Sequence, residues 1–521
     1  MASQPIHILR QLKWVLEVIL ILAVVGEIIL FPTLPNFYGC VMAVIGYWVF
    51  SFFLKEKYIR QFPFTFFIYL SMFMYRFLPL VATLAEGKPI TFGFERPYET
   101  FLYEIILFLF SSLAFYLACE KPLRNPKNNI IQKALYQFHF FQITPAILWG
   151  MGLLGLLTRL YNFGAGDVEY GDVGGKFLEG LTYLMYAPIC LIFPSLLGLK
   201  YSDKKSVWVY VSCIFIINIA SNSRQSIITP IATIVLLFFV YVILNNIKLT
   251  KYFSPAKWVF MGLILVFVLN LLTNVSLAML HTRKVRTDLD KLELFEKTIE
   301  TVQDETLMNR LKIAKDKAGE NQFITYIQGW TEQYVDNFML ARYANMRITD
   351  ETLYYAEKKG YANRQMQEVF KQNLWALLPT PVMRFFGVYL DKNKLEFSRG
   401  DLLYGSGFGG YRVTSHVGDG LATFGYWYFP IQFIVSFIVF KLVNSLVYYT
   451  RSGVLYSPYA VMGVFGFLGM FRNANGVTGD LGYIIRGFLQ DIITYLIIYH
   501  LVRMLLRFIN PKYVTIPKFQ S

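Results

Sequence analysis

Long apolar runs separated by short polar segments dominate this chain. Twelve runs approach the roughly 20 residues that a helix needs to cross a bilayer; they cover residues 14–31, 37–54, 62–84, 100–119, 138–160, 177–199, 207–220, 225–244, 258–280, 421–447, 456–471 and 481–506. A soluble protein of 521 residues would not be 55% hydrophobic with so many runs of this length. The pattern predicts an all-α polytopic membrane protein with about twelve transmembrane helices.

Only residues 281–420 form a long stretch that is too polar for a bilayer. We therefore expect three parts: a transmembrane bundle of about nine helices over residues 1–280, a partly helical loop region over 281–420, and about three helices with a C-terminal tail over 421–521. Leu292, Phe295, Ile299 and Val302 have helical spacing and predict an amphipathic helix early in the loop. After Gly360 the sequence becomes irregular and rich in proline and glycine.

The distribution of charge predicts the orientation in the membrane. The net charge is +15, but residues 281–420 hold 20 basic and 19 acidic residues, so the excess lies in the membrane part and its short loops. Alternate loops carry basic clusters such as Lys55, Lys57 and Arg60, whereas the other loops hold only Lys88, Arg96, Lys176, Arg224 and Arg472. By the positive-inside rule both termini are cytoplasmic and the long loop is extracytoplasmic. Topology thus explains the basic balance, and we expect no nucleic-acid partner.

The four cysteines, Cys40, Cys119, Cys190 and Cys213, all lie in apolar runs. They predict buried free thiols rather than a disulfide framework or a metal cluster. The first apolar run lacks a small-residue cleavage pattern, so we expect it to stay as a helix.

Several arginines share the outer level of the predicted membrane part. Arginine inside a span is costly and usually faces a polar cavity or a ligand, and its planar fork suits phosphate oxygens. Two of them, Arg472 and Arg486, flank a polar turn between late spans and are our main candidates for binding a pyrophosphate or a glycan; the others are Arg76, Arg224, Arg384, Arg399 and Arg412. Glu104 offers Arg76 a plain structural ion pair instead, and Arg159 and Arg224 at span ends are equally explained by snorkelling.

One histidine and one aspartate precede the tenth span. His416 and Asp419 lie in the segment "TSHVGDG", at the expected boundary between water and membrane. A histidine there, beside arginines, is a candidate general base, although a lone histidine is more often structural. Asp288 and Asp290 have no further metal ligands nearby and are interpreted as surface residues. We expect no metal and no other cofactor, and we find no nucleotide-binding loop.

Three stretches carry a resemblance to a known family. They are "ASNSRQSIITPIATIVLLFF" with Arg224, "TSHVGDGLATFGYWYFPI" with His416, and "MFRNANGVTGDLGYIIRGFL" with Arg472 and Arg486. Together with the cytoplasmic termini and one long outer loop before the last three spans, they resemble the Wzy-type polysaccharide polymerases of bacteria, which are related to O-antigen ligases among the GT-C-like membrane glycosyltransferases.

The resemblance implies a specific chemistry. Such enzymes polymerise polyprenyl-pyrophosphate-linked oligosaccharide repeat units at the outer leaflet of the bacterial inner membrane, for O-antigen or exopolysaccharide biosynthesis. The polyprenyl (undecaprenyl) pyrophosphate leaves, the anomeric configuration inverts, and no metal is needed. The expected partners are these lipid-linked oligosaccharides, membrane lipid, and a chain-length regulator and a flippase of the same pathway.

Two other functions stay open at this point. An O-antigen ligase, which transfers lipid-linked glycan to a lipid acceptor, has nearly the same sequence features. A lipid-linked-sugar flippase or other transporter would want polar residues at mid-membrane and an internal repeat. Here the charges gather at one face of the predicted membrane part instead.

Overall fold

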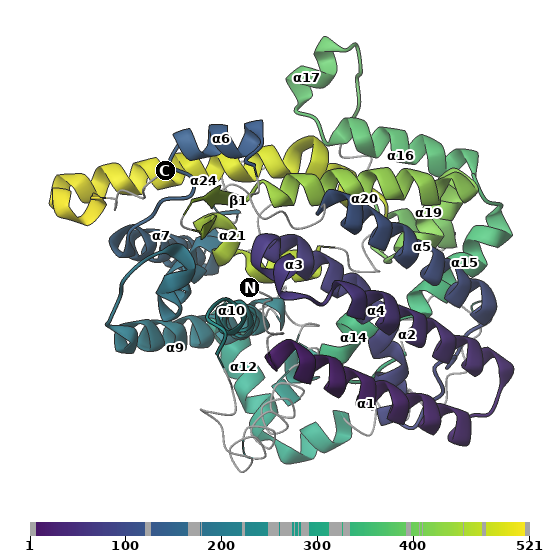
Figure 1. The fold of residues 1–521 in the computed structure, drawn as a ribbon. Coiled ribbons are helices and arrows are strands. Elements are labelled where there is room, and N and C mark those ends of the chain that lie inside the picture. Colours follow the sequence, from purple (N-terminus) through teal and green to yellow (C-terminus); the bar gives the residue numbers. More distant parts are fainter. Residues whose placement is uncertain are drawn as a thin grey trace. The chain divides into compact units, whose positions relative to one another are not determined.

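The computed structural model is predominantly helical in the part of the chain that it describes (Figure 1). The described residues are 7–119, 127–164, 178, 180–220, 224–247, 260, 274–275, 277–279, 281–282, 291–311, 326, 334–391, 397–405, 407–408, 410–451, 453–470 and 476–515. The chain divides into two compact units. Unit 1 comprises Met1–Leu123, Gly319–Asn444 and Phe467–Asp491, and unit 2 comprises Arg124–Ala318, Ser445–Gly466 and Ile492–Ser521.

Unit 1 is built on long apolar helices. They are α1 (His7–Leu30), α2 (Leu34–Phe53), α4 (Pro63–Ala85), α5 (Pro97–Ala118) and α20 (Tyr428–Asn444), with the short α3 (Glu56–Gln61) before α4. Proline in the first turn suits the starts of α4 and α5, because its missing N–H has no helical partner there. α5 lies against both α2 and α20. Stacked aromatic rings fill the core, for example Phe50 on Phe73 at 4.0 Å between centroids.

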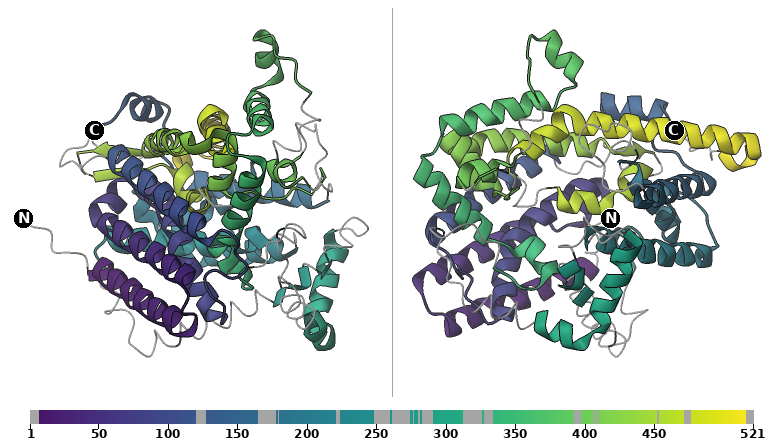
Figure 2. Two further views of the ribbon diagram at one scale, coloured as in Figure 1. Left: turned by 90° about the vertical axis from the view of Figure 1, so that its right-hand side faces the viewer. Right: turned by 180° about the vertical axis from the view of Figure 1, so that it is seen from behind.

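The second half of the long polar stretch packs on these helices. It forms α14 (Phe338–Ala344), α15 (Arg347–Lys359), α16 (Arg364–Ala376), α17 (Thr380–Phe385), α18 (Arg399–Tyr404) and α19 (His416–Phe424). α14 lies against α4, α15 against α18 and α19, and α16 against α19 and α23 (Thr478–Gly482). A short 3₁₀ turn, η7 (Gly425–Trp427), joins α19 to α20, and η9 (Tyr483–Gly487), a π-helix, follows α23. Two further views show α15, α16 and α19 lying together (Figure 2).

Unit 2 contains both helices and the chain's described sheet, a two-stranded antiparallel hairpin. Its elements are α6 (Ile130–Gln137), α7 (Pro145–Gly164), η1 (Thr182–Ile192), η2 (Pro194–Leu197), α9 (Lys204–Ala220), α10 (Arg224–Leu244), α12 (Lys291–Gln303), β1 (Val447–Thr450), β2 (Gly453–Tyr456), α21 (Pro458–Met462) and η10 (Pro511–Val514). α7 and η1 pack closely at Gly155, where an added Cβ would lie 2.2 Å from the Met185 nitrogen. α12 confirms that a helix forms where the sequence predicts an amphipathic one. α22 (Val464–Gly469) and α24 (Phe488–Ile509) each cross from one unit to the other along the sequence.

Six described helical stretches are long and apolar enough to cross a membrane. They are Leu34–Phe53, Pro63–Ala85, Pro97–Ala118, Gln225–Leu244, His416–Asn444 and Thr478–Ile509, and each corresponds to an apolar run in the sequence. The chain is therefore a helical membrane protein. The apolar helices Pro145–Tyr161 and Thr182–Ile192 are shorter, and most of run 258–280 lies outside the described residues. The number twelve stays a prediction.

The prediction that the cysteines are buried free thiols holds for three of the four. Cys40, Cys119 and Cys190 are buried free thiols, as expected. The prediction was wrong for Cys213, which is exposed on α9. An apolar sequence does not by itself imply burial, because a helix can leave one of its faces uncovered by the rest of the protein.

Candidate functional site

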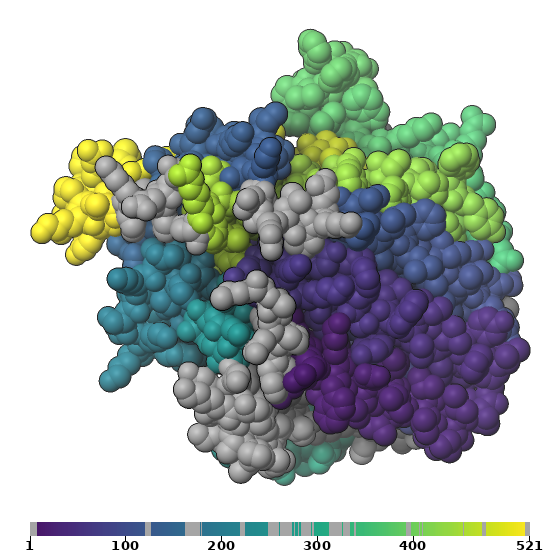
Figure 3. Space-filling view, in the orientation of Figure 1, coloured from purple at the N-terminus to yellow at the C-terminus, as the bar shows by residue number. Residues whose placement is uncertain are grey.

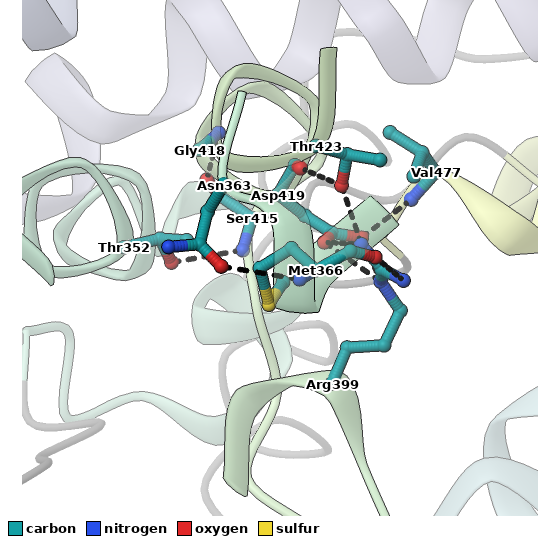
Figure 4. A network of polar contacts seen from close by, with 9 residues as sticks. All are labelled: Thr352, Asn363, Met366, Arg399, Ser415, Gly418, Asp419, Thr423 and Val477. Carbon is teal, nitrogen blue, oxygen red and sulfur yellow. Dashed lines mark hydrogen bonds and ion pairs between the residues drawn. The ribbon is translucent and has the colours of Figure 1, made fainter. Parts of the chain in front are cut away.

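The start of α19 is fixed by its own cap and by α15. The Ser415 hydroxyl accepts the Gly418 N–H at 3.0 Å, which is the standard cap for a helix N-terminus. The Ser415 N–H in turn donates to Oγ1 of Thr352 on α15, also at 3.0 Å (Figure 4). Gly418 lacks the space for a side chain, because an added Cβ would lie 2.5 Å from Cγ2 of Thr352. His416 is the first residue of this helix, so its position follows from local sequence and from packing on α15.

His416 is buried, with 4% of its surface exposed, and both of its ring nitrogens have partners. Nε2 lies 2.9 Å from Oδ2 of Asp480 on α23, and Nδ1 lies 2.6 Å from the Tyr428 hydroxyl at the start of α20. An ionised carboxylate only accepts hydrogen bonds, so Nε2 carries a hydrogen. In the neutral ring Nδ1 then accepts from Tyr428. This arrangement is an Asp480–His416–Tyr428 chain of hydrogen bonds.

Asp480 is the residue that the sequence analysis missed. It is 2% exposed, and its Oδ2 also accepts Nε2 of Gln432 on α20 at 2.8 Å. The signal was present in the polar turn between the last two predicted spans, where Asp480 is the single acidic residue of "RNANGVTGD". Its distance from His416 along the chain hid the pairing, since 64 residues separate them.

Asp419 has a different role from His416, although both lie on α19. Nε of Arg399 donates to Oδ1 and Oδ2 of Asp419 at 2.8 and 3.0 Å, and Oδ2 also accepts the Val477 N–H at 3.0 Å. Arg399 further donates to the Thr423 hydroxyl and, at 3.3 Å, to the Met366 carbonyl (Figure 4). Asp419 is fully buried. This ion pair, which we call the Arg399–Asp419 clamp, ties α18, α19 and the turn before α23 together.

In the clamp Arg399 forms an ion pair with an aspartate of the protein, and Arg412 does so as well. Nη1 of Arg412 lies 3.2 Å from Oδ1 of the buried Asp401, whose Oδ2 accepts the Tyr411 N–H at 3.0 Å. Gly400 permits this fold, because an added Cβ would lie 2.2 Å from the Arg412 carbonyl oxygen. In this state the Arg399 guanidinium is held by protein partners on all three nitrogens, whereas the Arg412 side chain is paired through Nη1 and stays 23% exposed.

Arg76 forms the structural ion pair that the sequence offered as an alternative. Its Nη2 donates to Oε2 of Glu104 on α5, and its Nη1 donates to the Met72 carbonyl at 2.8 Å. Oε1 of Glu104 accepts the hydroxyl of Thr349 on α15 at 2.8 Å. Both charged side chains are buried. The pair therefore joins two membrane helices to a loop helix.

Two of the predicted anion-binding arginines have exposed side chains. Arg486 lies in the π-helix η9, and its Nε donates to Oε1 of Gln490 at 2.6 Å. Arg384 lies at the end of α17. Arg472 falls outside the described residues. Arg224 begins α10 in unit 2, and its side chain falls outside the description as well. A π-helical turn often marks a functional position, which makes Arg486 the strongest described candidate for binding an anion.

A second buried carboxylate, Asp350 of α15, joins the loop to the start of α5. It accepts hydrogen bonds from the N–H groups of Glu95 and Arg96 at 2.7 and 2.9 Å, and from the hydroxyls of Thr100 and Tyr326. Burial raises the pKa of Asp350 to about 6 although these hydrogen bonds oppose the shift. The sequence analysis did not single out this residue. Asp350 holds α15, and through α15 the start of α19, against the membrane helices.

Among the residues that the structure describes, no group of three or more His, Cys, Asp or Glu side chains is placed to hold a metal ion. The site as described is thus one buried histidine between a carboxylate and a tyrosine, a neighbouring Arg–Asp clamp, and an exposed arginine on the helical segment that carries Asp480. No protein-family model, no curated protein and no solved structure matches the chain.

Proposed function

We propose that this protein is a membrane glycosyltransferase that polymerises polyprenyl-pyrophosphate-linked oligosaccharide repeat units at the outer leaflet of the bacterial inner membrane. The observation that carries the proposal is the Asp480–His416–Tyr428 chain at the start of two membrane-spanning helices. A carboxylate behind an imidazole is an arrangement that accepts a proton. Arg486 lies within two turns of Asp480 along the same helical segment and supplies positive charge.

The proposed reaction requires a group that accepts a proton and a group that stabilises the departing pyrophosphate. An acceptor hydroxyl attacks the anomeric carbon of the donor sugar, the bond from that carbon to the pyrophosphate oxygen breaks, and the hydroxyl proton must leave. The Tyr428 oxygen takes that proton as it passes its own to Nδ1 of His416, and Asp480 stabilises the resulting imidazolium. Arg486, together with Arg472, stabilises the departing pyrophosphate.

The proposal requires the site to open when substrate binds. The Tyr428 side chain is fully buried, and its ring packs on Gly420, where an added Cβ would lie 2.1 Å from Cδ2 of the tyrosine. The acceptor hydroxyl reaches Tyr428 only after the helices around it part. Such opening is common among enzymes that exclude water from the reacting groups.

The glycan made by a deletion strain tests the proposed function. We expect single repeat units on the carrier or on its final acceptor, because lipid-linked units would be made and moved across the membrane but not joined. Long unattached chains would show that the protein is a ligase instead. Lipid-linked units that accumulate on the cytoplasmic side would show that it is a flippase.

Arg486 provides a sharper test in the same strain. Arg486→Ala removes a charge-assisted hydrogen bond worth about 1.5–3 kcal/mol, which corresponds to roughly a 10- to 150-fold lower rate. Arg486→Lys keeps the charge but loses the two-pronged geometry, so we expect an intermediate effect. Glycan chain length on a gel, with the amount of membrane protein measured beside it, reports the result.

The matched control is Arg364→Lys, because the Arg364 side chain is 92% exposed on α16 and we expect its replacement to have no effect. Full-length glycan ladders from Arg486→Ala at normal protein level would contradict the role of Arg486.

Membrane orientation is a separate prediction. In a chain whose exposed Cys213 is replaced by alanine, Lys358→Cys on α15 should react with an impermeant thiol reagent added outside intact cells with a permeabilised outer membrane. Lys127→Cys and Lys204→Cys should react only after the inner membrane is opened. All three lysines are exposed, so access decides the result. Labelling of Lys204→Cys in intact cells would show that the predicted orientation is wrong.

A further inference from the structure

The segment around α17 exposes several large apolar side chains close together in the sequence. Phe385 is 85% exposed, Tyr389 83% and Phe386 61%, and Val382 and Trp375 add partly exposed apolar surface beside them. Helix α17 stands away from α16 and α19 in unit 1 (Figures 1 and 3). The ring of Phe386 lies near those of Trp375 and Phe385, at 6.1 and 5.4 Å between centroids. A cluster of exposed apolar side chains usually marks a contact with another molecule or with a membrane.

The packing of the segment before α17 shows which end of the last apolar helical stretch it lies near. Leu377, which follows α16, lies against Gly482, since an added Cβ there would be 3.5 Å from Cδ2 of the leucine. Gly482 is in the second turn of the span Thr478–Ile509. At 1.5 Å per residue it lies roughly 6 Å from the start of that span. α17 follows Leu377 by two residues, so it begins close to the N-terminal end of this apolar stretch, the end at which a spanning helix would meet the lipid headgroups.

The chemistry of the segment fits that position. Aromatic side chains with a polar edge or atom, such as Trp375 and Tyr389, favour the boundary between headgroups and acyl chains. Arg384 is exposed on α17 between these aromatics and bears the charge that attracts lipid phosphates. A long arginine side chain can hold its charge at the phosphates while its stem covers apolar surface. The opposite side of α17 is occupied, because Met383 is 1% exposed.

We propose that α17 and its flanks form a lipid-binding anchor that inserts into the headgroup boundary of the bilayer. Phe385, Phe386 and Tyr389 enter the upper acyl region, and Arg384 contacts the phosphates of the lipids around it. The anchor does not depend on the proposed enzymatic function. In this proposal Arg384 binds bilayer lipids, and other arginines bind the substrate pyrophosphate.

A fluorescence experiment on the full chain tests the anchor. An environment-sensitive dye is attached to Phe385→Cys in a chain whose exposed Cys213 is alanine, and the protein is reconstituted into vesicles of zwitterionic and anionic phospholipid. The control is the same dye on Arg364→Cys, at a position that is 92% exposed on α16. We expect the dye at position 385 to show a blue-shifted emission and strong quenching by a lipid with a nitroxide high on its acyl chain. A nitroxide near the chain end should quench it less.

The dye at position 364 should behave as in water and be quenched by a soluble nitroxide. Two results would overturn the proposal. If the dye at position 385 matches the one at 364, the segment lies in water. If its emission is blue-shifted but no lipid nitroxide quenches it, a protein surface, including a second copy of this chain, covers the segment instead. Because Phe385 is so exposed, its replacement leaves folding intact, and the protein's yield and elution profile verify this directly.

Discussion

Turnover should fall roughly 10²–10⁴-fold when Asp480 is replaced by asparagine or His416 by alanine, the range typical of lost proton-transfer catalysis. Asparagine keeps the shape of Asp480 but supplies no charge to stabilise the imidazolium at 2.9 Å. Alanine at position 416 removes the proton acceptor itself. The rate of repeat-unit joining per molecule of purified protein, measured in vesicles with a lipid-linked repeat unit, reports the effect. Binding of the lipid-linked donor should be largely kept.

Tyr428→Phe separates two versions of this mechanism. If the tyrosine oxygen relays the proton, as we propose, phenylalanine lowers turnover as well. If His416 instead takes the proton directly after Tyr428 moves aside, phenylalanine leaves turnover near the wild-type value or raises it. If the Asp480–His416–Tyr428 chain has a purely structural role, we expect the variants to lower the amount of folded protein but not the rate per molecule. Wild-type turnover in both His416→Ala and Asp480→Asn would remove His416 as the base.

The sequence located the histidine but not its carboxylate. His416 was singled out because it precedes an apolar run in a polar, glycine-rich segment, and the structure places it at the first turn of α19. The sequence analysis grouped it with Asp419, three residues away. In the structure His416 is hydrogen-bonded to Asp480 of α23, whereas Asp419 accepts hydrogen bonds from Arg399. Sequence proximity suggests shared chemistry, but the direction of each side chain depends on tertiary packing that one sequence does not encode locally.

The arginines divide for the same reason. A guanidinium group near a predicted span can bind either an anion from solution or a carboxylate of the protein. The sequence shows the arginine but not which of these two partners it binds. Glu104 was visible as a partner for Arg76, because both fall at one predicted depth, and their ion pair is confirmed. Asp401 and Asp419 were not visible as partners of Arg412 and Arg399, because the glycine-rich sequence around the short helices α18 and α19 has no period that predicts facing positions.

Membrane helices were predictable where the apolar run was long and free of charge. Runs such as 37–54 and 225–244 correspond to continuous helices with the same limits within a few residues. Run 177–199 instead contains the 3₁₀ segment η1, which has Pro188 inside it, followed by η2. Hydropathy reports that a segment avoids water, whereas proline and neighbouring packing decide whether it forms one straight α-helix.

Loss of the Arg399–Asp419 clamp should be among the most destabilising single changes in unit 1. Asp419→Ala leaves the Arg399 guanidinium buried without its carboxylate and leaves the Val477 N–H without its acceptor. Breaking a buried ion pair by removing one partner costs about 3–5 kcal/mol. We therefore expect a marked fall in the thermal unfolding temperature in detergent, together with a lower yield of folded protein.

Two further variants separate this structural role from catalysis. Glu368→Ala breaks the exposed pair of Glu368 with Arg364, whose side chains are 58% and 92% exposed, and should cost less than about 1 kcal/mol. The double variant Arg399→Met with Asp419→Leu replaces both charges by apolar groups and should recover much of the lost stability. Asp419→Asn keeps an acceptor for Val477 and should fold better than alanine. If Asp419→Asn unfolds at the wild-type temperature but loses turnover 10²-fold or more, a range typical of a lost base, Asp419 is catalytic and the clamp is not its function.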